Sequence, residues 1–266
     1  LVEVIVGVGV IAVLLGLLLP ALGTVRESGR QTACASNLKE LGAGTINYLA
    51  TYKNHLPQYA VEDPFSPGDE IVVGTLFGGK RGTLPFFGID EIGAADRPLN
   101  PFVGVTGVVS GPDGQEEGAE IFESPMDRGQ PANPDLGLPA VDSLYDYLGT
   151  SYTLNGNALD GEDCATLIPV STGPRPGGRM PAVADPSKTW MIAPQPIYNY
   201  SQGADRGQRW HSQGNFVNLC HVDGHVNIHV EVPPSEIGPD GFIVQNTTRE
   251  YTFLPNPRWL QQNCTP

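Results

Sequence analysis

Basic residues are few in this chain of 266 residues, and none of its cysteines are closely spaced. It carries 15 Lys and Arg residues against 29 Asp and Glu, for a formal net charge of −14, and the basic residues are scattered. Such a surface repels phosphate backbones, so no nucleic-acid partner is expected. The four cysteines form no CxxC motif, which leaves a structural zinc, a thioredoxin-like or a haem-c site without its ligand spacing.

Nucleophile motifs are absent as well, because no GxSxG occurs and no histidine has an evident nucleophile or carboxylate partner. The chain is therefore not expected to be an enzyme, and a membrane-tethered hydrolase is the weakest functional interpretation. Glycine and proline, in contrast, are abundant, with 33 and 25 residues, and follow no fixed period. They predict a loop-rich head rather than a collagen-like repeat.

The first 22 residues contain a single charge, at Glu3. A continuous helix of this length spans about 33 Å, so a transmembrane or filament-core helix is expected over residues 1–22. The run is too long for a secretory signal, and it lacks a cationic start and a small-residue cleavage site. A carboxylate in such a segment costs about 2.5 to 3.5 kcal/mol on insertion scales, so Glu3 needs a partner or a role.

An amphipathic pattern continues the helix over residues 23–55. The helix should end before Pro57, because proline disfavours helical backbone at the preceding residue. Residues 56–266 alternate short apolar patches with Gly and Pro breaks and predict a β-rich head. One helical face is formed by positions that recur at steps of three and four, which are Cys34, Leu38, Leu41, Thr45, Tyr48 and Tyr52.

The segment LVEVIVGVGVIAVLLGLLLPAL, followed by TVRESGRQTACASNLKELGAGTINYLATY, resembles the N-terminal methylation and cleavage segment of bacterial prepilins. The Glu3-to-Pro20 spacing is that of the family. The resemblance implies a type IV pilin or pseudopilin with an α+β fold, in which a long stem helix packs on an antiparallel sheet. It also implies that Glu3 neutralises the N-terminal amine of a neighbouring subunit. Members usually begin with an aromatic residue two positions before Leu1, which leaves the mature N-terminus open.

Four head segments resemble a prepilin subfamily that ends in a His-x9-Asp-Gly signature. Ser124 stands where that subfamily has a cysteine, and eleven residues instead of nine separate His211 from Asp223. The segments are ADRPLNPFV (95–103), IFESPMDRG (121–129), SYTLNGNAL (151–159) and RWHSQGNFVNLCHVDGHV (209–226).

The stretch NFVNLCHVDGHVNIHVEV predicts a β-hairpin with a two-residue type I′ turn at Asp223 and Gly224. The apolar face of this hairpin is expected to pack on the N-terminal helix. That face would hold Val217, Leu219, Val226, Ile228 and Val230 with His221, and the other Asn218, Cys220, His225, Asn227 and His229. Cys220, His225 and His229 are a minor zinc or copper candidate, while His211 is expected to be a hydrogen-bonded structural residue.

Further candidate sites lie elsewhere in the head. Asp160, Glu162 and Asp163 are possible Ca²⁺ ligands, although a solvated acidic turn is the stronger interpretation, and no other cofactor is expected. Triplets at Asn199 and Asn246 match the N-glycosylation pattern. The cysteines allow three disulfide pairings in an extracytoplasmic chain, with buried free thiols as the alternative; they are Cys34, Cys164, Cys220 and Cys264.

Together these patterns predict a structural subunit of an extracellular type IV pilus-like filament, a helical homo-oligomer. Gly7, Gly9 and Gly16 would permit close helix packing, and the segment from Gly16 to Pro20 should kink or unwind in the filament. The chain would pass from the cytoplasmic membrane to the cell surface with a prepilin peptidase and an assembly platform as partners. The alternative is a minor pseudopilin of a type II secretion-like machine that contacts exported proteins.

Overall fold

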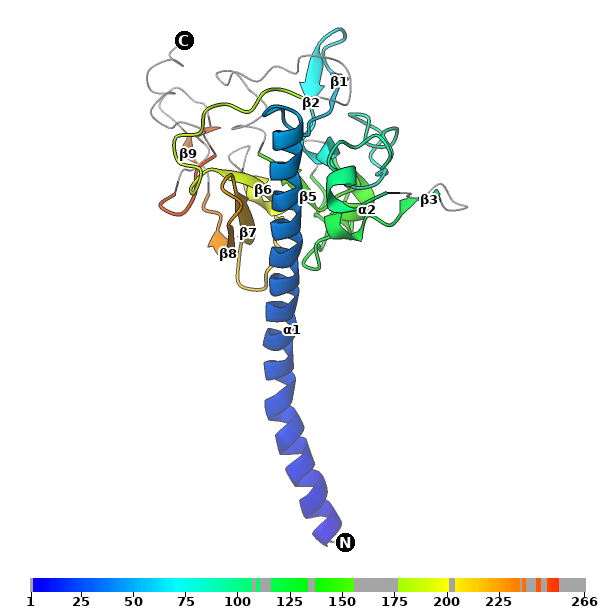
Figure 1. Ribbon diagram of the computed structural model, residues 1–266. Coiled ribbons are helices and arrows are strands. Elements are labelled where there is room, and N and C mark those ends of the chain that lie inside the picture. Colours follow the sequence, from blue (N-terminus) through cyan, green and yellow to red (C-terminus); the bar gives the residue numbers. More distant parts are fainter. Residues whose placement is uncertain are drawn as a thin grey trace.

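A computed structural model describes residues 2–106, 109–110, 116–133, 137–155, 177–200, 204–234, 236–237, 243–244 and 248–253. The fold is α+β, as the resemblance implies. One long helix, α1 (Val2–Thr51), dominates it. Figure 1 shows that the head surrounds only the C-terminal half of α1, while the N-terminal half projects away as a bare stem.

Helix α1 is helical without interruption through the positions of Gly16 and Pro20. The predicted kink refers to the assembled filament and stays a prediction. The helix ends at Thr51, ahead of Pro57, and the chain then turns through Lys53 and Asn54, whose φ angles are 55° and 65°. Within the described part of the chain, no helix has the length and hydropathy needed to cross a membrane.

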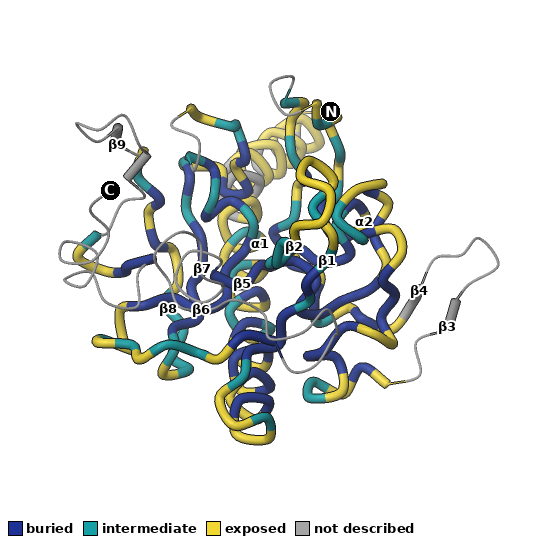
Figure 2. Tube along the Cα trace, turned by 90° about the horizontal axis from the view of Figure 1, so that it is seen from above, coloured by how far each residue is buried: buried dark blue, intermediate teal, exposed yellow. Residues whose placement is uncertain are grey.

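The predicted buried face of α1 is confirmed. Leu38, Leu41, Thr45 and Tyr48 are fully buried and Cys34 is 2% exposed. In Figure 2 the turns of α1 inside the head are dark blue on this side, whereas the turns near the N-terminus are yellow. The Thr45 hydroxyl donates to the Leu41 carbonyl at 2.9 Å, so a polar side chain is accommodated in the apolar face.

A four-stranded antiparallel sheet packs against this helix, with the strand order β5-β6-β7-β8. Its strands are β5 (Tyr152–Leu154), β6 (Trp190–Pro194), β7 (Phe216–His221) and β8 (Val226–Glu231). The smaller elements are β1 (Ala60–Glu62), β2 (Glu70–Val72), η1 (Gly74–Phe77), η2 (Asn100–Val103), β3 (Val109–Ser110), β4 (Glu116–Glu117), η3 (Glu120–Phe122), α2 (Leu144–Leu148), η5 (Gln195–Tyr198), β9 (Glu236–Ile237) and β10 (Ile243–Val244).

Both faces of this sheet are covered, and the helix lies on the face that was expected to be polar. Asn218 donates to the Gln31 carbonyl at 2.9 Å, and the Cys220 sulfur lies so close to Gly42 that a Cβ there would be 2.5 Å away. The small Gly42 allows this close approach. The prediction that the Val217 and Leu219 face packs on the helix is therefore wrong.

The Val217 and Leu219 face packs instead on a second apolar cluster formed late in the chain. Its members besides these two are Trp190, Ala193, Ile197, Val230, Val232, Tyr251 and Phe253. The indole of Trp190 meets the Phe253 ring edge-on, with ring centroids 5.2 Å apart. Segment 248–253 covers this face of the sheet. The apolar side chains of the face are therefore buried without contacting the helix.

The β7–β8 hairpin is confirmed, but its turn has three residues. The His221 amide donates to the His225 carbonyl at 2.9 Å, and the Gly224 amide donates to the His221 carbonyl at 2.8 Å. Gly224 has a φ of 85°. This is a type I turn followed by a left-handed residue, which needs one positive φ angle where a type I′ turn needs two.

A β-bulge further along β8 compensates for the altered turn. Val217 pairs with Val230 and Leu219 with Asn227, so two residues of β8 lie opposite Asn218 alone. Val230 therefore keeps its predicted face. Val226 instead packs with the cluster that contains Cys220, and Ile228 is 57% exposed, so their predicted place beside Val217 is wrong.

Candidate functional site

The main candidate for a functional surface is the bare stem of α1, residues 2–25. Its described apolar side chains are between 50% and 73% exposed. They are Val2, Val4, Ile5, Val6, Val8, Ile11, Val13, Leu14, Leu15, Leu18, Leu22 and Val25. A monomeric soluble protein rarely exposes a contiguous apolar surface of this kind, which indicates an interaction site.

The predicted assembly residues all lie on this stem. A Cβ added at Gly7, Gly9 or Gly16 would meet nothing within 4 Å, so within one chain these glycines face open space. The close packing predicted for these glycines would therefore require a second helix from another chain. The side chains of Glu3 and Pro20 lie outside the described residues, although both positions are helical.

The stem joins the head at Glu27. Its carboxylate accepts the Ser212 amide at 2.9 Å and the Ser212 hydroxyl at 2.7 Å, and these hydrogen bonds lower the pKa of Glu27. The buried His211 lies 3.8 Å from the same carboxylate, and burial followed by the neighbouring His229 lowers the pKa of His211. His211 thus lies at the junction of stem and head, and its expected role as a hydrogen-bonded structural residue stays a prediction.

One turn further along the helix, Gln31 holds the β8 bulge. Its amide nitrogen lies 2.9 Å from Nδ1 of His229, whose own backbone amide donates to Asn218 at 3.0 Å. His229 has a φ of 57°, unusual for a residue other than glycine, and its ring stacks on Phe216 with centroids 4.1 Å apart. These contacts hold the bulge against α1.

Sequence reasoning did not identify Glu27 and Gln31. The available signal was weak, because two polar residues four apart beside a buried stripe are also what an exposed helix edge shows. His211 lies at this junction, whereas Asp223 and Gly224 lie at the opposite end of the hairpin. The structure does not bring the three predicted signature residues together.

The head segments of the prepilin-like signature form an internal scaffold. Arg97 is fully buried and donates to the carbonyl oxygens of Ile92, Thr75, Gly78 and Leu148, the last three at 3.0, 2.8 and 3.2 Å. Asn100 is 1% exposed and binds both the amide and the carbonyl of Gly79 at 2.8 Å. Buried side chains here replace backbone partners that a loop-rich head cannot supply through regular strands.

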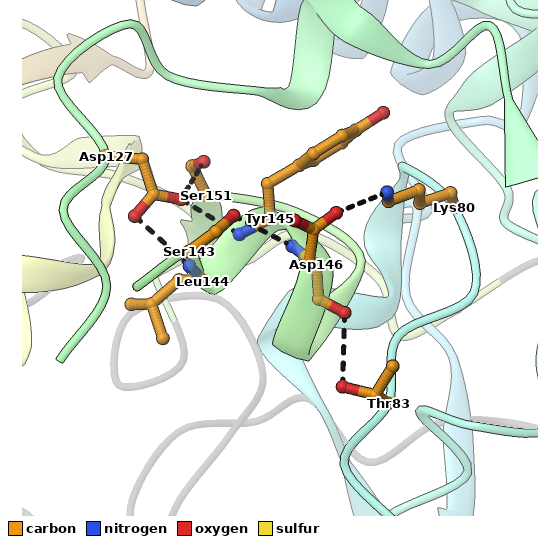
Figure 3. Close-up of polar contacts among 8 residues, drawn as sticks. All are labelled: Lys80, Thr83, Asp127, Ser143, Leu144, Tyr145, Asp146 and Ser151. Atoms are coloured by element: carbon orange, nitrogen blue, oxygen red, sulfur yellow. Dashed lines mark hydrogen bonds and ion pairs between the residues drawn. The ribbon is translucent and has the colours of Figure 1, made fainter. Parts of the chain in front are cut away.

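Asp127 organises the second and third segments (Figure 3). Its carboxylate accepts the amides of Leu144 and Tyr145 at 3.1 and 2.9 Å and the Ser151 hydroxyl at 2.6 Å. A third amide, from Gly129, donates to it at 2.8 Å. The N-terminal amides of helix α2 are thus satisfied by a charge-assisted acceptor.

Lys80 lies beside this helix, with its ammonium 2.6 Å from Asp146 and 4.2 Å from the centroid of the Tyr145 ring. Nearby Glu123 has its pKa raised by burial first, and then by the neighbouring carboxylates of Asp146, Asp127 and Glu120. The Lys80 ammonium acts in the opposite direction and lowers the pKa of Glu123.

The two cysteines in the described residues are not joined by a disulfide. Cys34 and Cys220 are buried free thiols, and burial raises the pKa of Cys34 and raises that of Cys220 to about 12. A disulfide through either is therefore not formed, because each thiol fills space between α1 and the sheet. Cys164 and Cys264 lie outside the described residues.

Two stacked histidines flank the turn of the hairpin. His221 and His225 have ring centroids 4.2 Å apart and nearly parallel planes, and His225 Nδ1 lies 2.5 Å from an Asp223 oxygen. His221 is fully buried, and burial with the neighbouring His225 lowers its pKa to about 4. Among the described residues, no group of three or more His, Cys, Asp or Glu side chains is placed to hold a metal ion, which disfavours the zinc or copper candidate.

Two further predictions have different outcomes. The Ca²⁺ candidates Asp160, Glu162 and Asp163 and the triplet at Asn246 lie outside the described residues. Asn199 is fully buried, donates to Asp205 at 2.9 Å and accepts the Gln208 amide at 2.8 Å. Its amide is therefore inaccessible to a sugar in the folded chain.

Comparison with known proteins gives one family match. A family model described as a protein of unknown function (DUF1559) matches residues 23–92, about a quarter of the chain. That family is associated with pilin-like, prepilin-type proteins. The matched region begins where the stem enters the head and includes the buried half of α1. No curated protein and no solved structure gives a significant match.

Proposed function

We propose that this protein is a structural subunit of a type IV pilus-like filament at the cell surface, polymerised through residues 2–25 of α1. The observation that carries the proposal is the projecting helix with its exposed valine, leucine and isoleucine side chains. The family match over residues 23–92 supports it, because that family is associated with pilin-like proteins.

Burial of this surface would supply the energy of assembly. Covering one exposed valine or leucine side chain completely is worth about 1.5 to 3 kcal/mol, so a helix with this many of them has a strong drive to be covered. Parallel packing of stems through Gly7, Gly9 and Gly16 would bring backbones close. A contact between two different faces of the stem does not close on itself and extends into a filament.

The test uses material sheared from the surface of cells that express the full chain. Helical fibres that bind an antibody against the head are expected by electron microscopy. The variant Leu14→Asp/Leu18→Asp should abolish fibres, whereas Phe65→Asp, at a 77% exposed position in the head, should leave them intact. A sheared fraction that lacks the protein, or normal fibres from the stem variant, overturns the proposal.

Glu3 has a defined role in this proposal. An unpaired carboxylate within an apolar helix bundle is unfavourable, so Glu3 would pair with the N-terminal amine of the adjacent subunit. The variant Glu3→Ala should accumulate to the normal level and form no fibres, as seen in the same shearing assay. Normal fibres from this variant would contradict the pairing but not the proposal that the protein forms a filament.

A further inference from the structure

The stem carries two arginines immediately below the head, Arg26 and Arg30, and both are exposed. They lie four residues apart and therefore on the same side of α1. Among the residues that the structure describes, no ion pair joins either guanidinium to a carboxylate. In a chain with a net charge of −14, the two arginines place positive charge on one side of the stem just below the head.

An acidic surface lies directly above them on the same side of the helix. Glu120 and Glu123 are exposed at η3, and the Glu123 carbonyl accepts the Asn37 side chain at 3.0 Å. At 100° per residue, Asn37 lies within about 40° of both arginines around the helix axis. The carboxylates around Glu123 also include Asp127 and Asp146, but Asp146 already pairs with Lys80 at 2.6 Å. A cation from outside the chain would therefore meet chiefly Glu120 and Glu123.

Within one chain the two charged groups are separated along the axis. A rise of 1.5 Å per residue places Arg30 and Arg26 about 10 and 16 Å below Asn37. A parallel copy displaced by this distance along the stem would bring its acidic surface level with the arginines. The bare stem of residues 2–25 is about 36 Å long, so more than half of it would still overlap with that of the displaced copy.

We infer that Arg26 and Arg30 of one subunit bind Glu120 and Glu123 of a second copy of this chain, and that this contact sets an axial stagger of about 10 to 16 Å. The inference rests on the proposed filament function and adds the polar contact that fixes the register. Apolar helix packing has little directional preference, whereas oppositely charged pairs select one offset. A second copy is the occupant because the charges are complementary and because the same displacement leaves the apolar stems in contact.

The test reverses each charge set separately and then mixes the two variants. The chains are Arg26→Glu/Arg30→Glu and Glu120→Lys/Glu123→Lys, and the measurement is the fraction of sheared protein that sediments as fibre. Each variant alone places like charges opposite each other. The fraction of its protein that sediments as fibre should therefore fall at least about tenfold. Co-expression of both in one cell should restore fibre, because every contact in an alternating filament then joins opposite charges.

The control Lys39→Glu/Lys53→Glu changes the net charge by the same amount as Arg26→Glu/Arg30→Glu, at two other exposed positions, and should assemble normally. Thermal unfolding of the purified variants confirms that each is folded. A wild-type chain without fibres overturns both the filament proposal and this contact. Fibres that tolerate both reversals, or reversed chains that co-expression does not rescue, overturn the contact alone.

The competing occupant is an anionic lipid surface, which arginines beside an apolar helix can also bind. Vesicles of phosphatidylglycerol are the probe. If the Arg26→Glu/Arg30→Glu variant loses vesicle binding while the Glu120→Lys/Glu123→Lys variant assembles normally, the arginines serve lipid and the inference is wrong. Loss of assembly in both variants with rescue on co-expression supports it.

Discussion

Asp127 is the residue on which helix α2 most depends. It accepts backbone amides from Gly129, Leu144 and Tyr145 and the hydroxyl of Ser151, so its removal leaves several donors without a partner. Hydrogen bonds to a charged group contribute about 1.5 to 3 kcal/mol each, and unsatisfied donors in a part-buried position add to the loss.

The variant Asp127→Ala is therefore expected to lower the free energy of unfolding by about 3 kcal/mol or more, measured by denaturant titration of the full chain. Asp142→Ala is the matched control, because Asp142 is exposed and close in sequence. It should change stability by less than about 0.5 kcal/mol. Equal effects of the two substitutions would contradict the role assigned to Asp127.

His221 makes stability depend on pH. Its pKa is lowered from 6.5 to about 4, first by burial and then by His225. Below pH 6.5 the unfolded chain takes up a proton that the folded chain does not, so stability falls as the pH decreases towards 4, where the folded form is protonated too. One such group gives a slope of up to about 1.4 kcal/mol per pH unit.

The variant His221→Gln should flatten the pH dependence of unfolding between pH 6.5 and 4 while lowering stability at pH 7. Denaturant titrations of both proteins at several pH values measure this. His55→Gln serves as the control, because His55 is not among the groups that shift the pKa of His221. An unchanged pH profile in His221→Gln would rule out His221 as the titrating group.

Two glycines, one in a turn and one in a helix, have opposite backbone conformations. Gly224 has a φ of 85° in the β7–β8 turn, and a Cβ there would lie 3.0 Å from the Ile46 side chain. Gly29 lies within α1, where a Cβ would meet nothing within 4 Å. Alanine is disfavoured at the first position and favoured at the second.

Gly224→Ala should therefore destabilise the protein by about 1 kcal/mol, whereas Gly29→Ala should stabilise α1 by about 0.5 to 1 kcal/mol. Differential scanning calorimetry of the two variants gives the shifts in melting temperature, which should have opposite signs. A stabilising Gly224→Ala substitution would be inconsistent with the three-residue turn.

The hairpin and the buried stripe of α1 could be predicted from sequence patterns, but the length of the hairpin turn could not. The hairpin was predictable because alternating apolar residues surround Asp223 and Gly224, and the buried stripe from Cys34 to Tyr48 was predictable from its helical period. The turn length was not, because Asp-Gly suits a three-residue turn as well as a type I′ turn. That one residue changes which side chains share a face, and only the bulge at His229 restores the register at Val230.

For the whole molecule, the stem from Gly16 to Pro20 carries the last prediction. Proline removes a backbone donor and clashes with the carbonyl four residues earlier, and glycine weakens the helix by about 1 kcal/mol relative to alanine. Neighbouring helices in a filament can cover backbone that opens here, so this segment should be kinked or unwound in the assembled state with both halves helical. A side-chain-resolution map of the filament tests this, and a straight, unbroken helix from Val4 to Tyr48 would overturn it.

The sequence by itself determined the long helix, its exposed and buried halves and the strands that flank the turn, because these depend on local period and on single residues such as Gly224. It also pointed to pilin-like assembly through the apolar stem. Only the tertiary structure decided that α1 packs on the Asn218 and Cys220 face, because that choice depends on the close approach allowed at Gly42 and on segment 248–253 covering the opposite face. Tertiary packing likewise decided that Cys220 is a buried thiol and that Glu27 and Gln31 fasten the head to the stem, since residues more than 180 positions apart meet there.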